Sequence, residues 1–242
     1  ALPLAKWLKS VTLSHLNRIW RNPPMSLKNE EITTLMELLS SRICHDLVSP
    51  VGAINNGLEF MEDMADDPEG RKEATNLIAH SATAAGARLM AFRLAYGAGA
   101  VDGNIKPEDV QKAFGTLIRT DGKIRQSWDP YGPLGIPTNT RAFCKILMGT
   151  LMLAQDSLPK GGMVFVDAGT GAETLITAEG TGATVRDGVT DALNGTLAMD
   201  KIDPRTVHPY VLGQSARTYG FDITLKDRAD DKIIWAITPH GE

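Results

Sequence analysis

Apolar residues recur every three or four positions along the segment from about residue 29 to residue 64. They are Ile32, Leu35, Met36, Leu39, Ile43, Leu47, Ile54, Leu58 and Met61. This spacing places them on one face of an α-helix, so the pattern predicts one long amphipathic helix. The pattern breaks at residues 65–70, where acidic residues and Pro68 suit the start of a second helix.

The second helix is predicted to run to about Tyr96, and many of its side chains are small. Its apolar stripe consists of Ala74, Leu77, Ile78, Ser81, Ala85, Leu89 and Phe92. Two long helices joined by a short turn form an antiparallel hairpin. Because one hairpin cannot cover both apolar stripes, we expect a homodimer in which two hairpins form a four-helix bundle.

After the Gly-Ala run at residues 97–100, the pattern changes to shorter helices and strands, which indicates a linker and a second domain. Helices are predicted near residues 107–119, 139–157 and 206–219, and strands near residues 123–127, 162–168, 172–178, 221–226 and 232–238. The expected fold class is α+β. A helical hairpin of residues 25–100 precedes an α/β sandwich of residues 101–242, with helices on one face of a mixed sheet.

Composition narrows the classes of function. The chain has 242 residues, 43% of them hydrophobic, which is enough for a sizeable core in one large or two modest domains. A formal charge of -4 does not indicate a basic surface that would bind nucleic acid. No apolar run approaches the roughly 20 residues that cross a bilayer. The two cysteines, Cys44 and Cys144, are too few for a disulfide framework. We therefore expect a cytoplasmic protein without nucleic-acid or membrane partners.

Residues 1–24 differ from the rest of the chain because they are basic and amphipathic. Their charged residues are Lys6, Lys9, Arg18 and Arg21. Such a stretch is typical of a membrane-surface helix or a targeting segment. Because two prolines separate it from an ordinary acidic globular sequence, we favour a leader or an artificial extension and exclude it from the fold prediction.

His45 is predicted to lie on the outward face of the first helix. At about 100° per residue, Leu39, Leu47, Ile54 and Leu58 fall within about 60° of Ile43, whereas His45 lies about 200° away. Ser41, Ser49, Gly52 and Asn56 share the outward stripe, with Glu59 nearby. Gly52 would let a partner backbone approach closely. Pro50 removes a backbone donor one turn after His45 and should bend or loosen the helix.

The string from Ser41 to Ile54, SRICHDLVSPVGAI, resembles the H-box of sensor histidine kinases. It has a histidine, an acid, an aliphatic residue, a small hydroxyl residue, a proline and a later isoleucine in the same register. More closely, residues 41–56 resemble the ChpT-type histidine phosphotransferases of a bacterial cell-cycle phosphorelay, and the resemblance extends more weakly over residues 26–242. It implies that His45 carries a phosphoryl group and exchanges it with receiver-domain aspartates.

The helix face and the resemblance together predict the site residues. His45 and Asp46 are the catalytic candidates, because a neutral imidazole is a nucleophile near pH 7 and Asp46 could orient it or accept its proton. The partner-binding candidates are Ser41, Arg42, Ser49, Gly52, Asn56 and Glu59. For Asp46 and these polar residues the alternative is an ordinary solvated side chain.

The second domain resembles a kinase ATP-binding domain that has lost its nucleotide boxes. Residues 151–162 resemble the N-box, but Leu153 stands where the magnesium-holding asparagine should be, and leucine cannot ligate a hard cation. Residues 178–182 resemble the Asp-x-Gly-x-Gly box, but Ala178 replaces the aspartate that reads adenine. No Gly-x-Gly lid follows between Asp187 and His208. We therefore expect no cofactor of the chain's own, with Mg²⁺ held by the partner receiver domain.

Two other classes of function stay open: a divergent ATP-dependent sensor histidine kinase and a non-catalytic dimeric adaptor. Leu153 and Ala178 count against the kinase, and the intact His45-Asp46 register counts against the adaptor. The resemblance implies a hybrid histidine kinase like CckA as one partner and the response regulators CtrA and CpdR as others. The sequence alone identifies neither these partners nor the net direction of phosphoryl flow.

Overall fold

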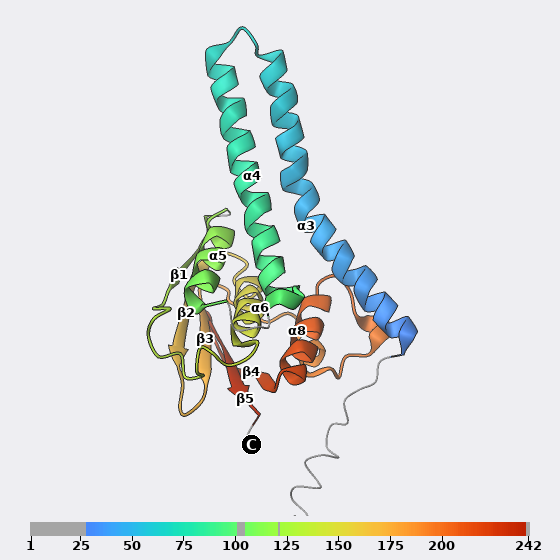
Figure 1. Cartoon of the computed structure of the whole chain (residues 1–242), viewed down its shortest axis with the longest axis vertical. Helices are drawn as coiled ribbons and strands as arrows, with labels where there is room; N and C mark the ends of the chain where they lie inside the picture. The colour runs from blue at the N-terminus through green and yellow to red at the C-terminus, as the bar shows by residue number, and fades with distance from the viewer. Residues whose placement is uncertain (1–27, 101–104, 121, 241–242) are drawn as a thin grey trace, which may run out of the picture. The chain divides into compact units, whose positions relative to one another are not determined.

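The structure is a computed structural model that describes residues 28–100, 105–120 and 122–240 (Figure 1). The chain divides into two compact units after Met36. The predicted leader, residues 1–24, lies outside the described residues, and the predicted domain boundary near residue 100 stays a prediction. Among the described residues, no helix has both the length and the apolar character that a membrane span requires.

The predicted helical hairpin is present as α3, Asn29–Asp63, and α4, Pro68–Tyr96. Asp67 caps α4 by accepting a hydrogen bond from the Glu69 backbone nitrogen at 3.1 Å, and a proline occupies the favoured first position. α3 stays helical through Pro50. The two helices meet at Gly57, where an added Cβ would lie only 2.7 Å from Ile78 Cγ1. This close approach needs a glycine.

The second half of the chain forms the predicted mixture of helices and strands. The elements are η1 (Ala98–Ala100), α5 (Pro107–Arg119), β1 (Ile124–Ser127), α6 (Phe143–Asp156), β2 (Gly162–Ala168), β3 (Thr174–Glu179), α7 (Val189–Asn194), η2 (Met199–Lys201), α8 (Val207–Thr218), β4 (Phe221–Ala229) and β5 (Lys232–Pro239). The strands form one sheet in the order β1-β2-β3-β5-β4, in which only β1 and β2 are parallel. The mixed sheet is therefore confirmed, and α7 is an element that the sequence did not predict.

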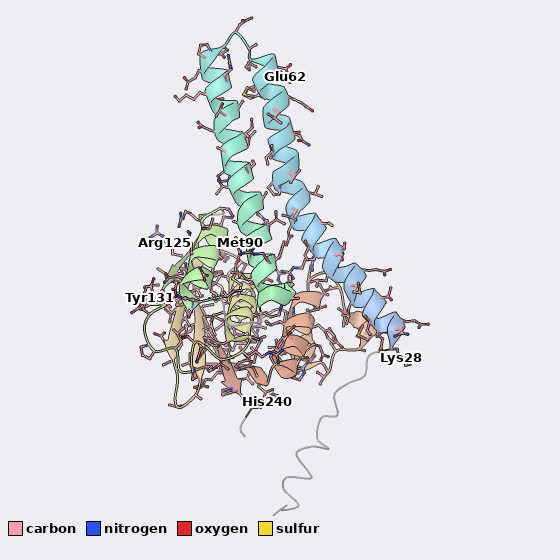
Figure 2. All side chains as sticks on the ribbon, in the orientation of Figure 1. Lys28, Glu62, Met90, Arg125, Tyr131 and His240 are labelled. Carbon is pink, nitrogen blue, oxygen red and sulfur yellow. The ribbon has the colours of Figure 1, made fainter. Side chains whose placement is uncertain are left out.

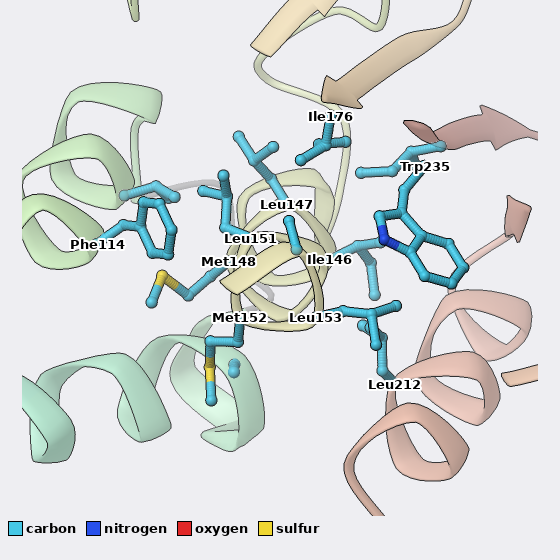
Figure 3. Close-up of a cluster of buried hydrophobic side chains, with 14 of the residues drawn as sticks. Phe114, Ile146, Leu147, Met148, Leu151, Met152, Leu153, Ile176, Leu212 and Trp235 are labelled. Atoms are coloured by element: carbon cyan, nitrogen blue, oxygen red, sulfur yellow. The ribbon is translucent and has the colours of Figure 1, made fainter. Parts of the chain in front are cut away.

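Helix α6 is the centre of the core. It contacts α4, α5 and α8 on one side and strands β2, β3 and β5 on the other. Figure 3 shows it end on, with Phe114, Ile176, Trp235 and Leu212 closing around it from four different elements. The helix begins at Phe143 rather than near residue 139, because Ala142 before it is in the left-handed region with φ 62°.

The glycines of the box-like sequences have a packing role. Gly161 precedes β2, Gly162 is its first residue, and Gly180 follows β3. A Cβ on Gly180 would overlap the Gly161 carbonyl oxygen, and one on Gly162 would overlap the Glu179 carbonyl oxygen. These glycines therefore let two backbone segments approach closely, which explains them without a nucleotide.

Candidate functional site

His45 projects from α3 into solvent, with 89% of its side chain exposed. Most of the stripe predicted to surround it is exposed too, namely Ser41, Ser49, Asn56 and Glu59. Gly52 is half-buried, but a Cβ built on it would meet no atom within 4 Å. The predicted direction of His45 is thus confirmed, and the stripe is an open surface on which a partner could dock.

Asp46 is the immediate polar neighbour of His45. Its Oδ1 lies 3.4 Å from His45 Nδ1, a long contact, and 35% of its side chain is exposed. A carboxylate at Nδ1 favours the tautomer that carries its proton there. The lone pair of Nε2 is then left facing solvent.

The sequence prediction missed the apolar part of this surface. Val48 is 67% exposed and Val51 is 47% exposed, although both are aliphatic residues. Val48 follows His45 by three residues and lies about 60° from it around the helix. The same helical wheel that singled out His45 could have found Val48. The surface around His45 therefore offers a partner apolar as well as polar contacts.

Arg42 points a different way from the rest of the predicted docking residues. Its Nη2 donates to Asp156 Oδ2 at 3.0 Å and its Nη1 to the Pro204 carbonyl oxygen at 3.4 Å. Only 15% of its side chain is exposed. Burial is the largest single cause and lowers the pKa of Arg42, but the charges of Asp156, Tyr96 and Asp46 and the hydrogen bond to Asp156 together raise it more, so the pKa is raised. The guanidinium therefore binds acceptors of the chain itself. The role of Arg42 in partner binding stays a prediction.

His208, for which the sequence predicted no role, joins three helices. Its Nε2 lies 3.1 Å from the Gly149 carbonyl oxygen, and its Nδ1 lies 2.7 Å from the Tyr96 hydroxyl oxygen. Because a carbonyl can only accept, Nε2 carries the proton and Nδ1 accepts from the tyrosine. Burial lowers the pKa of His208 to about 4, with the charge of Arg42 as a second cause. Burial also raises the pKa of Tyr96.

The buried His208 predicts a pH dependence of stability. Its folded pKa of about 4 lies below the ordinary 6.5, so between these values the unfolded chain binds a proton that the folded chain does not. The free energy of unfolding should therefore fall by roughly 3 kcal/mol as the pH drops through this window, and the contribution should be flat above it. Urea unfolding at several pH values measures this. His208→Gln, which cannot titrate, should show a correspondingly shallower slope, and equal slopes in both proteins would contradict the prediction.

The two positions at which the chain departs from the nucleotide boxes hold buried apolar side chains. Leu153 is 2% exposed and Ala178 is fully buried, and Figure 3 shows Leu153 beside Leu212. The cavity next to Leu153 measures about 10 Å³, whereas small-molecule sites usually measure hundreds of Å³. Across residues 28–100, 105–120 and 122–240, no three His, Cys, Asp or Glu side chains gather as a metal site would require.

Comparisons with known proteins show the family of the chain. The family model for the histidine phosphotransferase C-terminal domain matches residues 107–231. The protein phosphotransferase ChpT of Brucella abortus (strain 2308) is 34% identical over 203 residues, which cover 82% of this chain and 93% of that protein. A solved structure of a bacterial phosphotransferase has 31% identity and a TM-score of 0.69, covering 88% of this chain and 98% of that chain. The chain belongs to the ChpT-type histidine phosphotransferases and is a protein phosphotransferase.

Proposed function

We propose that this chain is the histidine phosphotransferase of a bacterial phosphorelay. His45 accepts a phosphoryl group from the receiver aspartate of a hybrid histidine kinase and passes it to response-regulator receivers of the CtrA or CpdR kind. The observation that carries the proposal is the exposed His45 imidazole with the Asp46 carboxylate at its Nδ1, on a surface open to a partner. A cytoplasmic location is part of the same proposal.

The chemistry requires little beyond a placed nucleophile. The lone pair of His45 Nε2 attacks the phosphorus of the receiver's acyl phosphate, an N–P bond forms, and the P–O bond to the aspartate breaks. The aspartate leaves as a carboxylate, and the phosphoimidazole keeps its Nδ1 proton, whose positive charge Asp46 stabilises. The reverse step loads a second receiver. Positioning and charge stabilisation supply most of the rate in phosphoryl transfer, and the receiver brings the Mg²⁺ and its lysine.

The same proposal holds that the second domain does not use ATP. Support comes from Leu153 and Ala178 at the box-like positions and from the cavity of about 10 Å³ between Leu153 and Val189. A divergent kinase would need room for a nucleotide and oxygen ligands for its metal ion. These observations favour the transferase over the kinase.

One labelling experiment separates the three candidate functions. The protein is incubated first with labelled ATP alone and then with a labelled, phosphorylated receiver domain. Label taken only from the receiver supports the transferase. Label taken from ATP alone would support the kinase, and no label from either source would support the adaptor.

We also propose that the protein is a homodimer through α3 and α4. Apolar side chains stay exposed on both helices: Leu58 is 44%, Leu77 40%, Leu89 55% and Met90 40% exposed. Leu58 belongs to the predicted core face of α3, so at this position the face is not fully covered by the chain's own residues. Figure 2 shows side chains standing out along both helices of the hairpin. A second copy would cover this apolar surface and complete a four-helix bundle.

Sedimentation should therefore show a dimer at micromolar concentration. Ile54→Asp should dissociate or unfold it, because an uncompensated buried charge costs several kcal/mol. Asn55→Asp adds the same charge at the next, exposed position and should leave the dimer unchanged. A parental protein that sediments as a clean monomer would exclude this assembly.

A further inference from the structure

Arg42 and Asp46 stand four residues apart on α3. On a helix surface this spacing brings side chains together, and opposite charges at it ordinarily pair. In this structure Arg42 and Asp46 do not pair with each other, and each contacts a different residue. Arg42 donates to Asp156 at 3.0 Å, and Asp46 contacts the His45 imidazole at 3.4 Å. The local pairing is therefore replaced by a contact to a residue 114 positions away.

Three charged side chains near His45 line the same cavity. Arg42, Asp46 and Asp156 all line a cavity of about 190 Å³, which Arg88 lines too. Arg42 thus has room to turn from one carboxylate to the other. The charge of Asp46 already acts on Arg42, although more weakly than that of Asp156, and both charges raise the Arg42 pKa against the effect of burial. Asp156 and Asp46 therefore compete for the same guanidinium.

This competition matters because the Asp46 carboxylate is the group that contacts His45 Nδ1. A carboxylate that accepts two donors from an arginine is drawn toward the arginine plane and is less available to a second, longer contact. If Arg42 paired with Asp46, the 3.4 Å contact to His45 Nδ1 would be lost or weakened. The imidazole would then be free to turn and to place its proton on Nε2.

We propose that Asp156 holds Arg42 away from Asp46, so that the Asp46 carboxylate is left to orient the His45 imidazole. Asp156 is thus a positioning residue that acts through Arg42. The second domain, without nucleotide chemistry, supplies this positioning residue from the end of α6. The proposal rests on the assignment of His45 as the phosphoryl carrier.

The test is a pair of single variants and their combination. Asp156→Ala should lower the rate of transfer at saturating receiver about five- to tenfold with little change in the half-saturating receiver concentration, because the docking stripe is untouched. Arg42→Ala removes the cation that competes for Asp46, and its rate is the reference for the combined variant. Arg42→Ala combined with Asp156→Ala should transfer at the rate of Arg42→Ala alone, because Asp156 acts only through Arg42.

The nitrogen-15 chemical shifts of His45 give an independent readout. Asp156→Ala should shift the tautomer toward the proton on Nε2, and the double variant should restore the proton to Nδ1. This measurement needs no receiver, so it tests the pairing even were the parental protein to transfer nothing, an outcome that would instead remove the proposed function. Asp156 is 41% exposed, so its replacement should leave the fold intact.

A matched control is Glu69→Ala, which breaks the exposed pair of Lys72 and Glu69 far from His45 in sequence and should change neither the rate nor the tautomer. Two results would overturn the proposal. One is an Asp156→Ala protein with the parental rate and tautomer. The other is a double variant that is slower than Arg42→Ala by about the same factor by which Asp156→Ala is slower than the parental protein, because Asp156 would then act without Arg42.

Discussion

Replacing His45 by alanine is expected to abolish phosphoryl transfer, a loss of at least about 1,000-fold, because no other group of the site can form the N–P bond. The substitution should leave the fold intact. With 89% of its side chain exposed, His45 contributes few contacts, and removal of such a side chain changes the free energy of unfolding by no more than about 0.5 kcal/mol. The variant should therefore fold and dimerise as the parental protein does.

The measurement is label transfer from a phosphorylated receiver, followed by treatment of the labelled protein with acid and alkali. A phosphoramidate should be labile in acid and stable in alkali, unlike phosphoserine. His80→Ala provides the control, since His80 is also an exposed histidine, on α4, and should transfer at the parental rate. A His45→Ala protein that still accepts label would move the phosphoryl carrier to another residue.

Strong local signals made the main elements predictable. The apolar period of α3 and α4 and the proline at the start of α4 fix both helices to within a residue or two of the observed ends. α7 was missed because its six residues are too few for a period to show, and it is bounded instead by Gly188 and Gly195, both in the left-handed region. α6 begins later than predicted because the backbone of Ala142 departs from helical geometry before it.

The direction of His45 was predictable for the same reason, since a helical wheel needs only the sequence. Contacts between residues far apart in the sequence were not predictable. Arg42 meets Asp156 from 114 residues away, and Tyr96 meets His208 from 112 residues away. No local pattern marks such partners, because the fold alone brings them together. For this reason the sequence grouped Arg42 with the docking residues and gave no sign of its contact with Asp156 at the end of α6.

Gly52→Arg should separate docking from folding. Gly52 lies two turns after His45 and within about 20° of it around the helix, so a long side chain there would stand in the path of a docking receiver. In the chain itself, a Cβ at Gly52 meets nothing within 4 Å and its backbone needs no left-handed conformation. Arginine is also the better helix former by about 0.8 kcal/mol. The variant should therefore be as stable as the parental protein or slightly more stable.

Transfer should nevertheless fall on the order of 100-fold, because a displacement of about 1 Å between reacting atoms is enough to cost this much. Gly52→Ala is the matched control: it brings a similar gain in helix stability, but its methyl group is short, and transfer should stay within a few-fold of the parental rate. Thermal unfolding and single-turnover transfer, measured on both variants, check the two halves of the prediction. Transfer by Gly52→Arg at the parental rate would mean that receivers do not dock over the His45 stripe, and the docking surface would have to be sought on another face of the hairpin.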